Sequence, residues 1–496
     1  MATKYDAQTW PAVAPGTPVM DHNDFVRDVS EAFERLRTRG DFITVWDGGA
    51  IPVPRYTGEN YGQGRAVIHF QGVQRLRTGQ HFLVSGGDKL QPTSHVFILH
   101  LASAAPAGAG PLGSNVMRSR DPDQADVLVQ VIGIEHERWH AGGISLLGDI
   151  LAVPLEGIGT LDGAGQQIPS RIAFFHLADP IAPTRFPFEI PRATANAGAV
   201  TLTKLPNDHF LCAVWQDGVT KNDTGWLDFH LSTAAGEFGP FGPVCTKWKY
   251  PARQPGDRGN PRYQSIGFVQ QVPGAGATGQ WLYLIATTNT ETLAPTIPGH
   301  DVADLFAIQL PRELLADPMV SPGPFPAPRL TWLARKRLEG ADEHCNFAAA
   351  AGVHVDSEGI LSLYGGFHWR ISGTIRLTEF RSEEPALAGA AHEWVDLFED
   401  EDFRGRRLSI LGTRTTTIPD YDKVLAQGKG FGDRTSSLRY QLPVGKRYRL
   451  YPDKNFSPAD PKRCLDLAGT GGVVEVSDVE RLKRGFGNCV SSSRFV

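Results

Sequence analysis

A short motif recurs five times between residues 69 and 350, and it constrains the fold more than any other feature of the chain. In every copy a polar residue is followed three positions later by a small one. The copies occupy residues 69–73, 140–144, 196–200, 262–266 and 346–350, so their starts are 56 to 84 residues apart. Recurrence of this kind is typical of repeat architectures, in which each copy forms one structural unit.

Two further segments with the composition of strands follow each motif. The first is an apolar run, such as residues 82–84 or 281–285, and the second ends in a polar and a large apolar residue, such as residues 100–101. Three strands per copy, with room for a fourth, predict one blade of a β-propeller. We therefore expect an all-β protein with a five-bladed propeller over residues 41–385. A flat β-sandwich with weak repetition is the alternative.

The small residue of the motif has a steric reason in a propeller. The innermost strands of all blades converge on the axis, where backbones approach closely and large side chains would clash. The fourth residues of the five copies fit this expectation: Gly72, Gly143, Ala199, Ser265 and Ala349.

Helical periodicity is scarce in this chain. Between residues 24 and 39 the apolar side chains Phe25, Val29, Phe33 and Leu36 fall near one helical face, and Gly40 follows as a stop signal. We expect residues 1–40 to form an N-terminal segment with one short helix.

A second repetition lies near the C-terminus. Residues 431–439 recur as residues 486–494, and each copy carries a Gly-Asp/Asn-x-x-Ser-Ser signature. Upstream of each signature lies a matched aromatic element, at residues 397–403 and 450–456. Residues 394–496 therefore contain an internal duplication.

This pattern of aromatic corner and signature resembles a βγ-crystallin domain built from two Greek keys. The resemblance implies Ca²⁺ sites in which each ion is held by one signature loop and a carbonyl from the other Greek key. The side-chain ligands that it implies are Asp433, Ser436, Asn488 and Ser491, and the carbonyl ligands are those of Arg434 and Cys489. Clustered carboxylate, amide, hydroxyl and carbonyl oxygens suit a hard cation that takes six to eight oxygen ligands.

The chain departs from the crystallin pattern at one position of each signature. Gly432 and Gly487 stand where the family has Asn or Asp, and the change removes a ligand or a loop-stabilising hydrogen bond. As an alternative to calcium binding, Asp433 and Asn488 cap turns and the serines satisfy backbone groups.

Composition excludes several classes of function. A net charge of −5 leaves no polybasic surface for nucleic acid, and no apolar run is long enough for a membrane span. The N-terminus lacks the apolar core of a secretory signal; we expect a cytoplasmic protein by default, or a secreted one if a signal has been removed. The five cysteines have no metal-type spacing. Oligomeric state is left open.

The polar residue of each motif precedes an innermost strand, so all five should meet at one mouth of the propeller channel. The expected ligand-binding residues are His69, His140, Asn196, Arg262 and Asn346, with Gln71 beside them. A polar ring in a concave site is the default position for a ligand. We expect it to recognise a glycan or another small polar molecule, with Trp46 and Trp139 available for stacking.

Two catalytic interpretations compete with simple recognition. A propeller of five blades resembles the propellers of several glycosidase families. Glycoside cleavage in those families needs two carboxyl groups at a defined spacing. The candidates in this chain are Glu137, Asp257 and Asp342, followed by Glu59 and Glu343. Alternatively, His69 and His140 hold a second metal ion, because imidazole suits zinc, iron or copper.

A purely structural interpretation also stands. Polar side chains in a propeller channel can simply be bridged by water, because buried polar groups need hydrogen-bond partners. The sequence His136-Glu137-Arg138-Trp139-His140 superficially matches a zinc-protease motif, but that motif requires a helix, and this segment leads into a predicted strand.

Overall fold

The computed structural model divides the chain into two compact units, Met1–Glu383 and Glu384–Val496. In the first unit it describes residues 10–14, 24–46, 69–76, 81–88, 93–101, 127–157, 168–180, 182–193, 195–217, 225–244, 247–250, 262–271, 280–290, 300–315, 325–340, 345–356, 359–369 and 373–382. In the second it describes residues 394–401, 407–411, 417–418, 425–426, 429–430, 434–442, 444–453, 463–470, 473–483 and 490–495.

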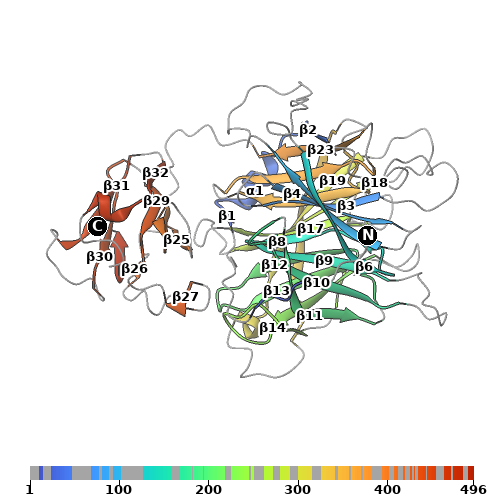
Figure 1. The fold of residues 1–496 in the computed structure, drawn as a ribbon, viewed down its shortest axis with the longest axis horizontal. Helices are drawn as coiled ribbons and strands as arrows, with labels where there is room; N and C mark the ends of the chain where they lie inside the picture. Colours follow the sequence, from blue (N-terminus) through green and yellow to red (C-terminus); the bar gives the residue numbers. More distant parts are fainter. Residues whose placement is uncertain are drawn as a thin grey trace. The chain divides into compact units, whose positions relative to one another are not determined.

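The first unit contains three five-stranded sheets and one closed barrel of eight strands, which divides at its two parallel pairings, β2 with β6 and β21 with β3, into the antiparallel sheets one and five (Figure 1). Sheet one contains β3 (His69–Arg75), β4 (His81–Asp88), β5 (Thr93–His100) and β6 (Val127–His136). Sheet two contains β7 (His140–Ala141), β8 (Ser145–Leu147), β9 (Ile150–Glu156), β10 (Ser170–His176) and β11 (Thr184–Arg192). Sheet three contains β12 (Ala199–Lys204), β13 (Phe210–Gln216), β14 (Trp226–Ser232), β15 (Phe241–Pro243) and β16 (Trp248–Lys249).

The last two sheets follow the same plan. Sheet four contains β17 (Ser265–Gln271), β18 (Leu282–Thr290), β19 (His300–Gln309) and β20 (Arg329–Leu338), with α2 (Arg312–Leu315) after β19. Sheet five contains β21 (Ala350–Val355), β22 (Leu361–Gly366), β23 (Thr374–Arg381) and, from the other end of the chain, β2 (Asp41–Trp46). In each sheet the predicted motif forms or immediately precedes the first strand, as expected.

Strand pairing closes the sheets into a ring. The N-terminal strand β2 pairs antiparallel with β23, from Asp41 opposite Glu379 to Trp46 opposite Thr374; Figure 1 shows blue β2 beside orange β23. The innermost strands β21 and β3 meet in parallel. This arrangement is a β-propeller of five blades, and completion of the last blade by the first strand ties the two ends of the ring together.

Five apolar cores separate the blades. Each of the clusters in this unit draws most of its buried side chains from two neighbouring sheets. Between blades one and two, for example, Leu83 and Ile98 pack with Leu151 and Phe175. Burial between neighbouring sheets, rather than in one central core, is what a ring of blades requires.

The small residues of the motif lie where the innermost strands crowd together, as predicted. A Cβ atom on Gly72 would lie 2.6 Å from the backbone nitrogen of Ile144, on the next blade. One on Gly143 would overlap the carbonyl oxygen of Gln264 and lie 3.0 Å from the Cβ of Ala199.

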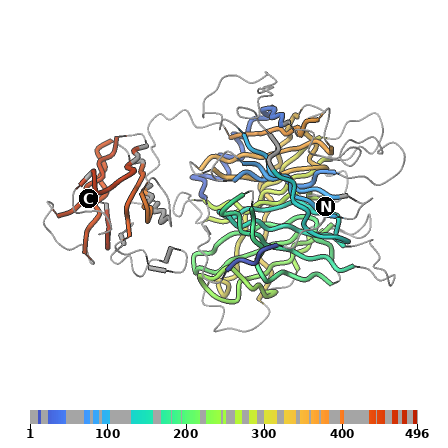
Figure 2. Tube along the Cα trace, viewed as in Figure 1, coloured from blue at the N-terminus to red at the C-terminus, as the bar shows by residue number. Residues whose placement is uncertain are grey.

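The N-terminal segment is less helical than its periodicity predicts. Phe25–Val26 forms β1, which pairs in parallel with β17, and α1 covers only Val29–Glu34. Asp28 caps this helix by accepting a hydrogen bond from the Glu31 amide at 2.9 Å. The apolar spacing therefore reflects packing of the whole segment against blades four and five. Figure 2 shows the dark blue residues 10–14 beside green strands of blade two, where Ala12 bridges to Arg185.

The second unit contains two four-stranded sheets that exchange strands. One has the order β25 (Arg407–Leu411), β24 (Trp394–Phe398), β29 (Ser437–Gln441) and β32 (Val473–Val476). The other has the order β26 (Thr417–Ile418), β33 (Ser492–Phe495), β30 (Arg447–Tyr451) and β31 (Leu465–Ala468). The hairpin of β27 (Leu425–Ala426) and β28 (Lys429–Gly430) and the short α3 (Val479–Leu482) complete the described elements.

Each of these sheets takes three strands from one copy of the duplication and its remaining edge strand, β32 or β26, from the other copy. The serines of the two signatures make equivalent contacts. Ser437 and Ser492 each donate a hydroxyl hydrogen bond of 2.6 Å to an upstream carbonyl, of Asp400 and Asp453 respectively. The sequence duplication therefore corresponds to a structural one.

Candidate functional site

Polar side chains gather at one end of the propeller channel, where the innermost strands begin and the second strands end. His69 and His140 start β3 and β7, and Gln264 immediately precedes β17. Glu156 ends β9, and Asp217 follows the last residue of β13. Because neighbouring strands in a blade run antiparallel, these starts and ends share one side of the ring. We call this region the channel mouth.

A chain of hydrogen bonds crosses the channel mouth. Glu156 Oε2 lies 2.5 Å from His140 Nδ1, and His140 Nε2 lies 2.8 Å from the amide nitrogen of Gln71. Gln71 in turn accepts a hydrogen bond from the amide nitrogen of Gln264. The carboxylate accepts, so His140 Nδ1 carries hydrogen and Nε2 accepts from Gln71. The chain thus joins side chains of blades one, two and four.

Two further histidines extend the network. His69 Nε2 lies 3.2 Å from His140 Nε2, and the rings of His69 and His368 have centroids 6.2 Å apart. His368 Nε2 lies 2.9 Å from the amide nitrogen of Asn346. Burial lowers the pKa of His368 to about 4, so its ring is neutral at pH 7 and accepts the amide hydrogen.

Asp217 is the most perturbed carboxyl group of the mouth. Burial raises its pKa to about 6, and a hydrogen bond of 2.7 Å from Trp215 Nε1 opposes the rise. The charge of Glu156 raises the pKa further, whereas Arg262 and His140 lower it. Asp217 therefore gains and loses its proton near pH 6. The neighbouring Glu156 is hydrogen-bonded to the imidazole of His140.

Two half-buried tryptophans flank the histidines. The Trp139 ring lies against His140 with centroids 4.9 Å apart, and Trp369 stacks on His368 at 5.3 Å. Flat apolar faces beside hydrogen-bonding groups are typical of sites for small polar ligands.

The structure brings together only some of the expected ligand-binding residues. His140 contacts both His69 and Gln71, and Asn346 joins them through His368. Arg262 is exposed and acts on Asp217 through its charge.

Asn196 differs from the other residues of the motif. Its main-chain carbonyl accepts a hydrogen bond of 2.6 Å from Arg192 Nε. Its side-chain oxygen is buried and has no hydrogen-bond partner within the described part of the chain.

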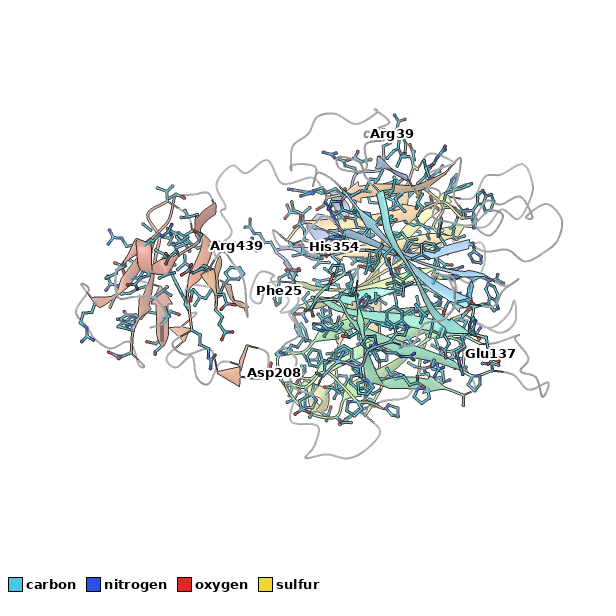
Figure 3. All side chains as sticks on the ribbon, viewed as in Figure 1. Phe25, Arg39, Glu137, Asp208, His354 and Arg439 are labelled. Carbon is cyan, nitrogen blue, oxygen red and sulfur yellow. The ribbon has the colours of Figure 1, made fainter. Side chains whose placement is uncertain are left out.

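The catalytic candidates taken from the sequence are not at the centre of this network. Glu137 is exposed and lies between β6 and β7 with a φ of 72° (Figure 3). Asp257 and Asp342, like Glu59 and Glu343, lie outside the described residues, as does the Trp46 side chain. Residues 136–140 do not form the helix that a zinc-protease motif requires, because His136 ends β6 and His140 begins β7.

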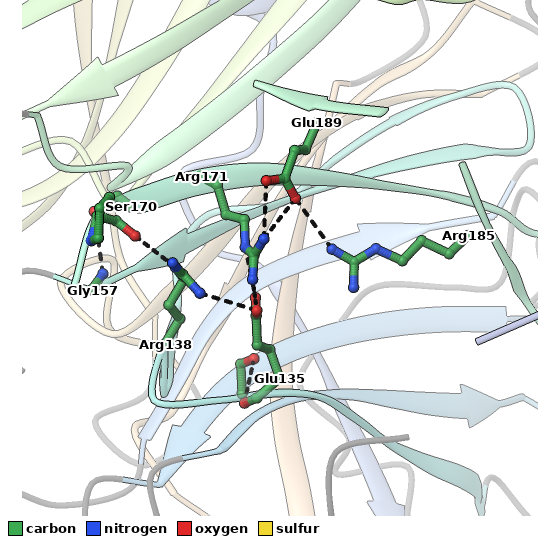
Figure 4. A network of polar contacts seen from close by, with 9 residues as sticks. Glu135, Arg138, Gly157, Ser170, Arg171, Arg185 and Glu189 are labelled. Carbon is green, nitrogen blue, oxygen red and sulfur yellow. Dashed lines mark hydrogen bonds and ion pairs between the residues drawn. The ribbon is translucent and has the colours of Figure 1, made fainter. Parts of the chain in front are cut away.

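The nearby Glu135 belongs to a separate charge network (Figure 4). It accepts hydrogen bonds from Arg138 at 3.1 Å and from Arg171 Nε at 2.9 Å, and Arg171 also pairs with Glu189 at 2.8 Å. Arg185 lies 3.5 Å from Glu189. These contacts tie β6, β10 and β11 together and commit Glu135 to a structural role.

Metal binding remains a prediction at both expected places. Among the described residues, no three His, Cys, Asp or Glu side chains are grouped as metal ligands, and His69 and His140 meet each other instead. Of the calcium ligands implied by the crystallin resemblance, Asp433, Asn488 and Cys489 lie outside the described residues.

The remaining three implied calcium ligands are described. Ser436 and Ser491 donate main-chain hydrogen bonds of 2.9 Å to Phe398 and Tyr451. The Arg434 guanidinium pairs with Glu399 at 2.6 Å.

Sequence reasoning missed Glu156, Asp217 and His368. All three lie at or just after the end of a second strand, which places them beside the polar residue that starts the innermost strand. The recurring motif predicts only where the innermost strands begin. Pairing each motif with the end of the following apolar run would have identified these residues.

No protein family matches the sequence, and no curated protein matches it. Among solved structures, a mannose phosphorylase from Leishmania mexicana has 10% identity and a TM-score of 0.32, covering 63% of this chain and 83% of its own. An α-L-arabinanase from Penicillium chrysogenum has 11% identity and a TM-score of 0.29, covering 74% and 98%. A xylan β-1,4-xylosidase from Bacillus halodurans has 9% identity and a TM-score of 0.31, covering 86% and 83%. At these scores the fold assignment rests on the strand pairing described above.

No helix in the described part of the chain has the length and hydropathy needed to cross a membrane.

Proposed function

We propose that the channel mouth binds a glycan and cleaves a glycosidic bond. One observation carries this proposal: the mouth holds two carboxyl groups in different environments. Burial raises the pKa of Asp217 to about 6, whereas Glu156 is hydrogen-bonded to His140. Glycoside cleavage uses such a pair, with one carboxyl group protonated and the other ionised.

The environments assign the two roles. Asp217 is the general acid that protonates the leaving oxygen, because its pKa keeps a proton available up to about pH 6. Glu156 is the partner that acts as base or nucleophile, and His140 orients it through their hydrogen bond. Trp139 and Trp369 provide faces on which sugar rings stack.

A glycan-binding protein without turnover is the second candidate. The hydrogen bonds among Gln264, Gln71 and His140 favour it, because these groups already satisfy one another and would form a rigid recognition surface. In that case Asp217 contributes hydrogen bonding alone.

Turnover of aryl glycosides and short oligosaccharides separates the two candidates. We expect the wild-type protein to hydrolyse at least one member of a panel of pentosides and hexosides, and Asp217→Asn to lower kcat by about 10²- to 10⁴-fold. Glu137→Gln serves as a matched control, since Glu137 is an exposed carboxyl group three residues before His140. Saturable glycan binding without hydrolysis would replace the enzyme with the binding protein.

For the second unit, we propose a βγ-crystallin-like double Greek key that binds Ca²⁺ weakly. The exchanged edge strands and the equivalent contacts of Ser437 and Ser492 support it. Those two serines are committed to carbonyl groups. The crystallin resemblance implies the hydroxyl oxygens of Ser436 and Ser491 as ligands within the described signature residues, and such oxygen donors suit a hard cation.

A further inference from the structure

A cavity lies at the other end of the propeller channel. Its wall is formed by the last residues of innermost strands from all five blades, and its volume is about 70 Å³. Figure 3 shows His354, on the cavity wall, and Glu137, near the channel mouth, at opposite ends of the first unit. Because one water needs roughly 10 to 15 Å³, the cavity holds more than a single water.

Two buried glutamines line this cavity with fixed amide orientations. Gln74 donates from Nε2 to the Ile144 carbonyl at 3.0 Å, and Gln270 donates from Nε2 to Thr203 Oγ1 at 2.7 Å and the Lys204 carbonyl at 2.8 Å. Since a carbonyl group only accepts, the amide atom facing it must be nitrogen. Each glutamine therefore ties two blades together through its nitrogen.

The same contacts leave two acceptors at the cavity. The side chains of Gln74 and Gln270 are only 3% and 5% exposed. Within the described part of the chain, neither Oε1 accepts a hydrogen bond. Both glutamines line the cavity, so a donor group of a bound ligand can pair with their Oε1 atoms.

The rest of the wall narrows the choice of ligand. Leu202 and Phe268 add apolar surface. Arg75 is paired with Glu379 at 3.4 Å, so its charge is already balanced. The cavity thus combines the two amide acceptors with an apolar wall, which suits a neutral molecule rich in hydroxyl donors.

We propose that this cavity is a second ligand site, which binds a neutral polyol of monosaccharide size through Gln74 and Gln270. Hydroxyl groups supply the donors that the two Oε1 atoms lack, and the C–H faces of a sugar or cyclitol pack on Leu202 and Phe268. The site is separate from the channel mouth and does not depend on catalysis there.

Ligand-observed NMR titrations of the full-length chain with D-glucose, D-xylose, L-arabinose and myo-inositol test this site. We expect saturable binding of at least one of them to the wild type. Gln270→Leu should weaken it at least about tenfold, because it removes a buried acceptor. His354→Trp, which keeps both glutamines and narrows the cavity, should have a similar effect. Both variants are first checked by circular dichroism and melting temperature.

Asp217→Asn distinguishes this site from the channel mouth. The substitution should leave polyol binding unchanged, whatever it does to hydrolysis. The proposal is overturned if none of the four compounds binds, if His354→Trp and Gln270→Leu both bind as well as the wild type, or if Asp217→Asn abolishes binding.

Discussion

At the residue scale, the proposed glycoside cleavage depends on two acids with different partners. Glu156 faces an imidazole, whereas Asp217 is buried beside Trp215 and has a raised pKa. A raised carboxyl pKa costs stability once the group must ionise in the folded state. The same burial that makes Asp217 suitable as an acid should therefore be measurable as a pH-dependent loss of stability.

Asp217→Asn should gain stability relative to the wild type as the pH rises from 4 to 7. The folded protein holds the Asp217 proton up to about pH 6, whereas the unfolded chain releases it near 3.8, so the wild-type contribution falls across this interval. The raised pKa of Asp217 corresponds to a loss of at most about 3 kcal/mol in the free energy of unfolding. Denaturant unfolding of both proteins at pH 4 and pH 7 measures it. A stability difference that stays constant between the two values would contradict the assignment.

At the element scale, five polar-x-x-small motifs were sufficient to predict five blades. The small residues mark the axis because backbone crowding there excludes side chains, and that constraint is local enough to read from one sequence. Closure of the ring by β2 was not predictable, because it pairs residues 41–46 with a strand more than 300 positions away. Glu156 and Asp217 were missed for a similar reason, since only the antiparallel pairing brings strand ends beside the motif.

Gly143→Ala should destabilise the propeller by about 1 to 3 kcal/mol or more, because the new Cβ would overlap the Gln264 carbonyl across the axis. Gly242→Ala is the matched control, since a Cβ there meets no atom within 4 Å. Thermal and denaturant unfolding compare the two. Equal stability of both variants would argue against crowding at the axis.

At the scale of the whole molecule, two compact units imply separable unfolding transitions. The duplication at residues 431–439 and 486–494 predicted a domain of two similar halves. The second unit has two four-stranded sheets, each of which takes one edge strand from the other half. Calcium binding could not be inferred equally well, because Asp433 and Asn488 lie outside the described residues.

Millimolar Ca²⁺ should raise the melting temperature of the second unit and leave the propeller transition in place. A ligand that binds only the folded state stabilises it by mass action, by about 2.7 kcal/mol at a concentration one hundred times the Kd. Asp433→Ala combined with Asn488→Ala should remove the effect. Calorimetry that detects neither heat of Ca²⁺ binding nor a shift in melting would exclude the ion from this unit.

The pH dependence of kcat/KM tests the central proposal, glycoside cleavage at the channel mouth, most directly. If Asp217 is the general acid, kcat/KM for the best glycoside should fall about tenfold per pH unit above pH 6, since the deprotonated group no longer assists the leaving oxygen. The residual activity of Asp217→Asn should lack this limb, and that of Glu137→Gln should retain it. An Asp217→Asn variant with the wild-type rate and the same descending limb would contradict the account.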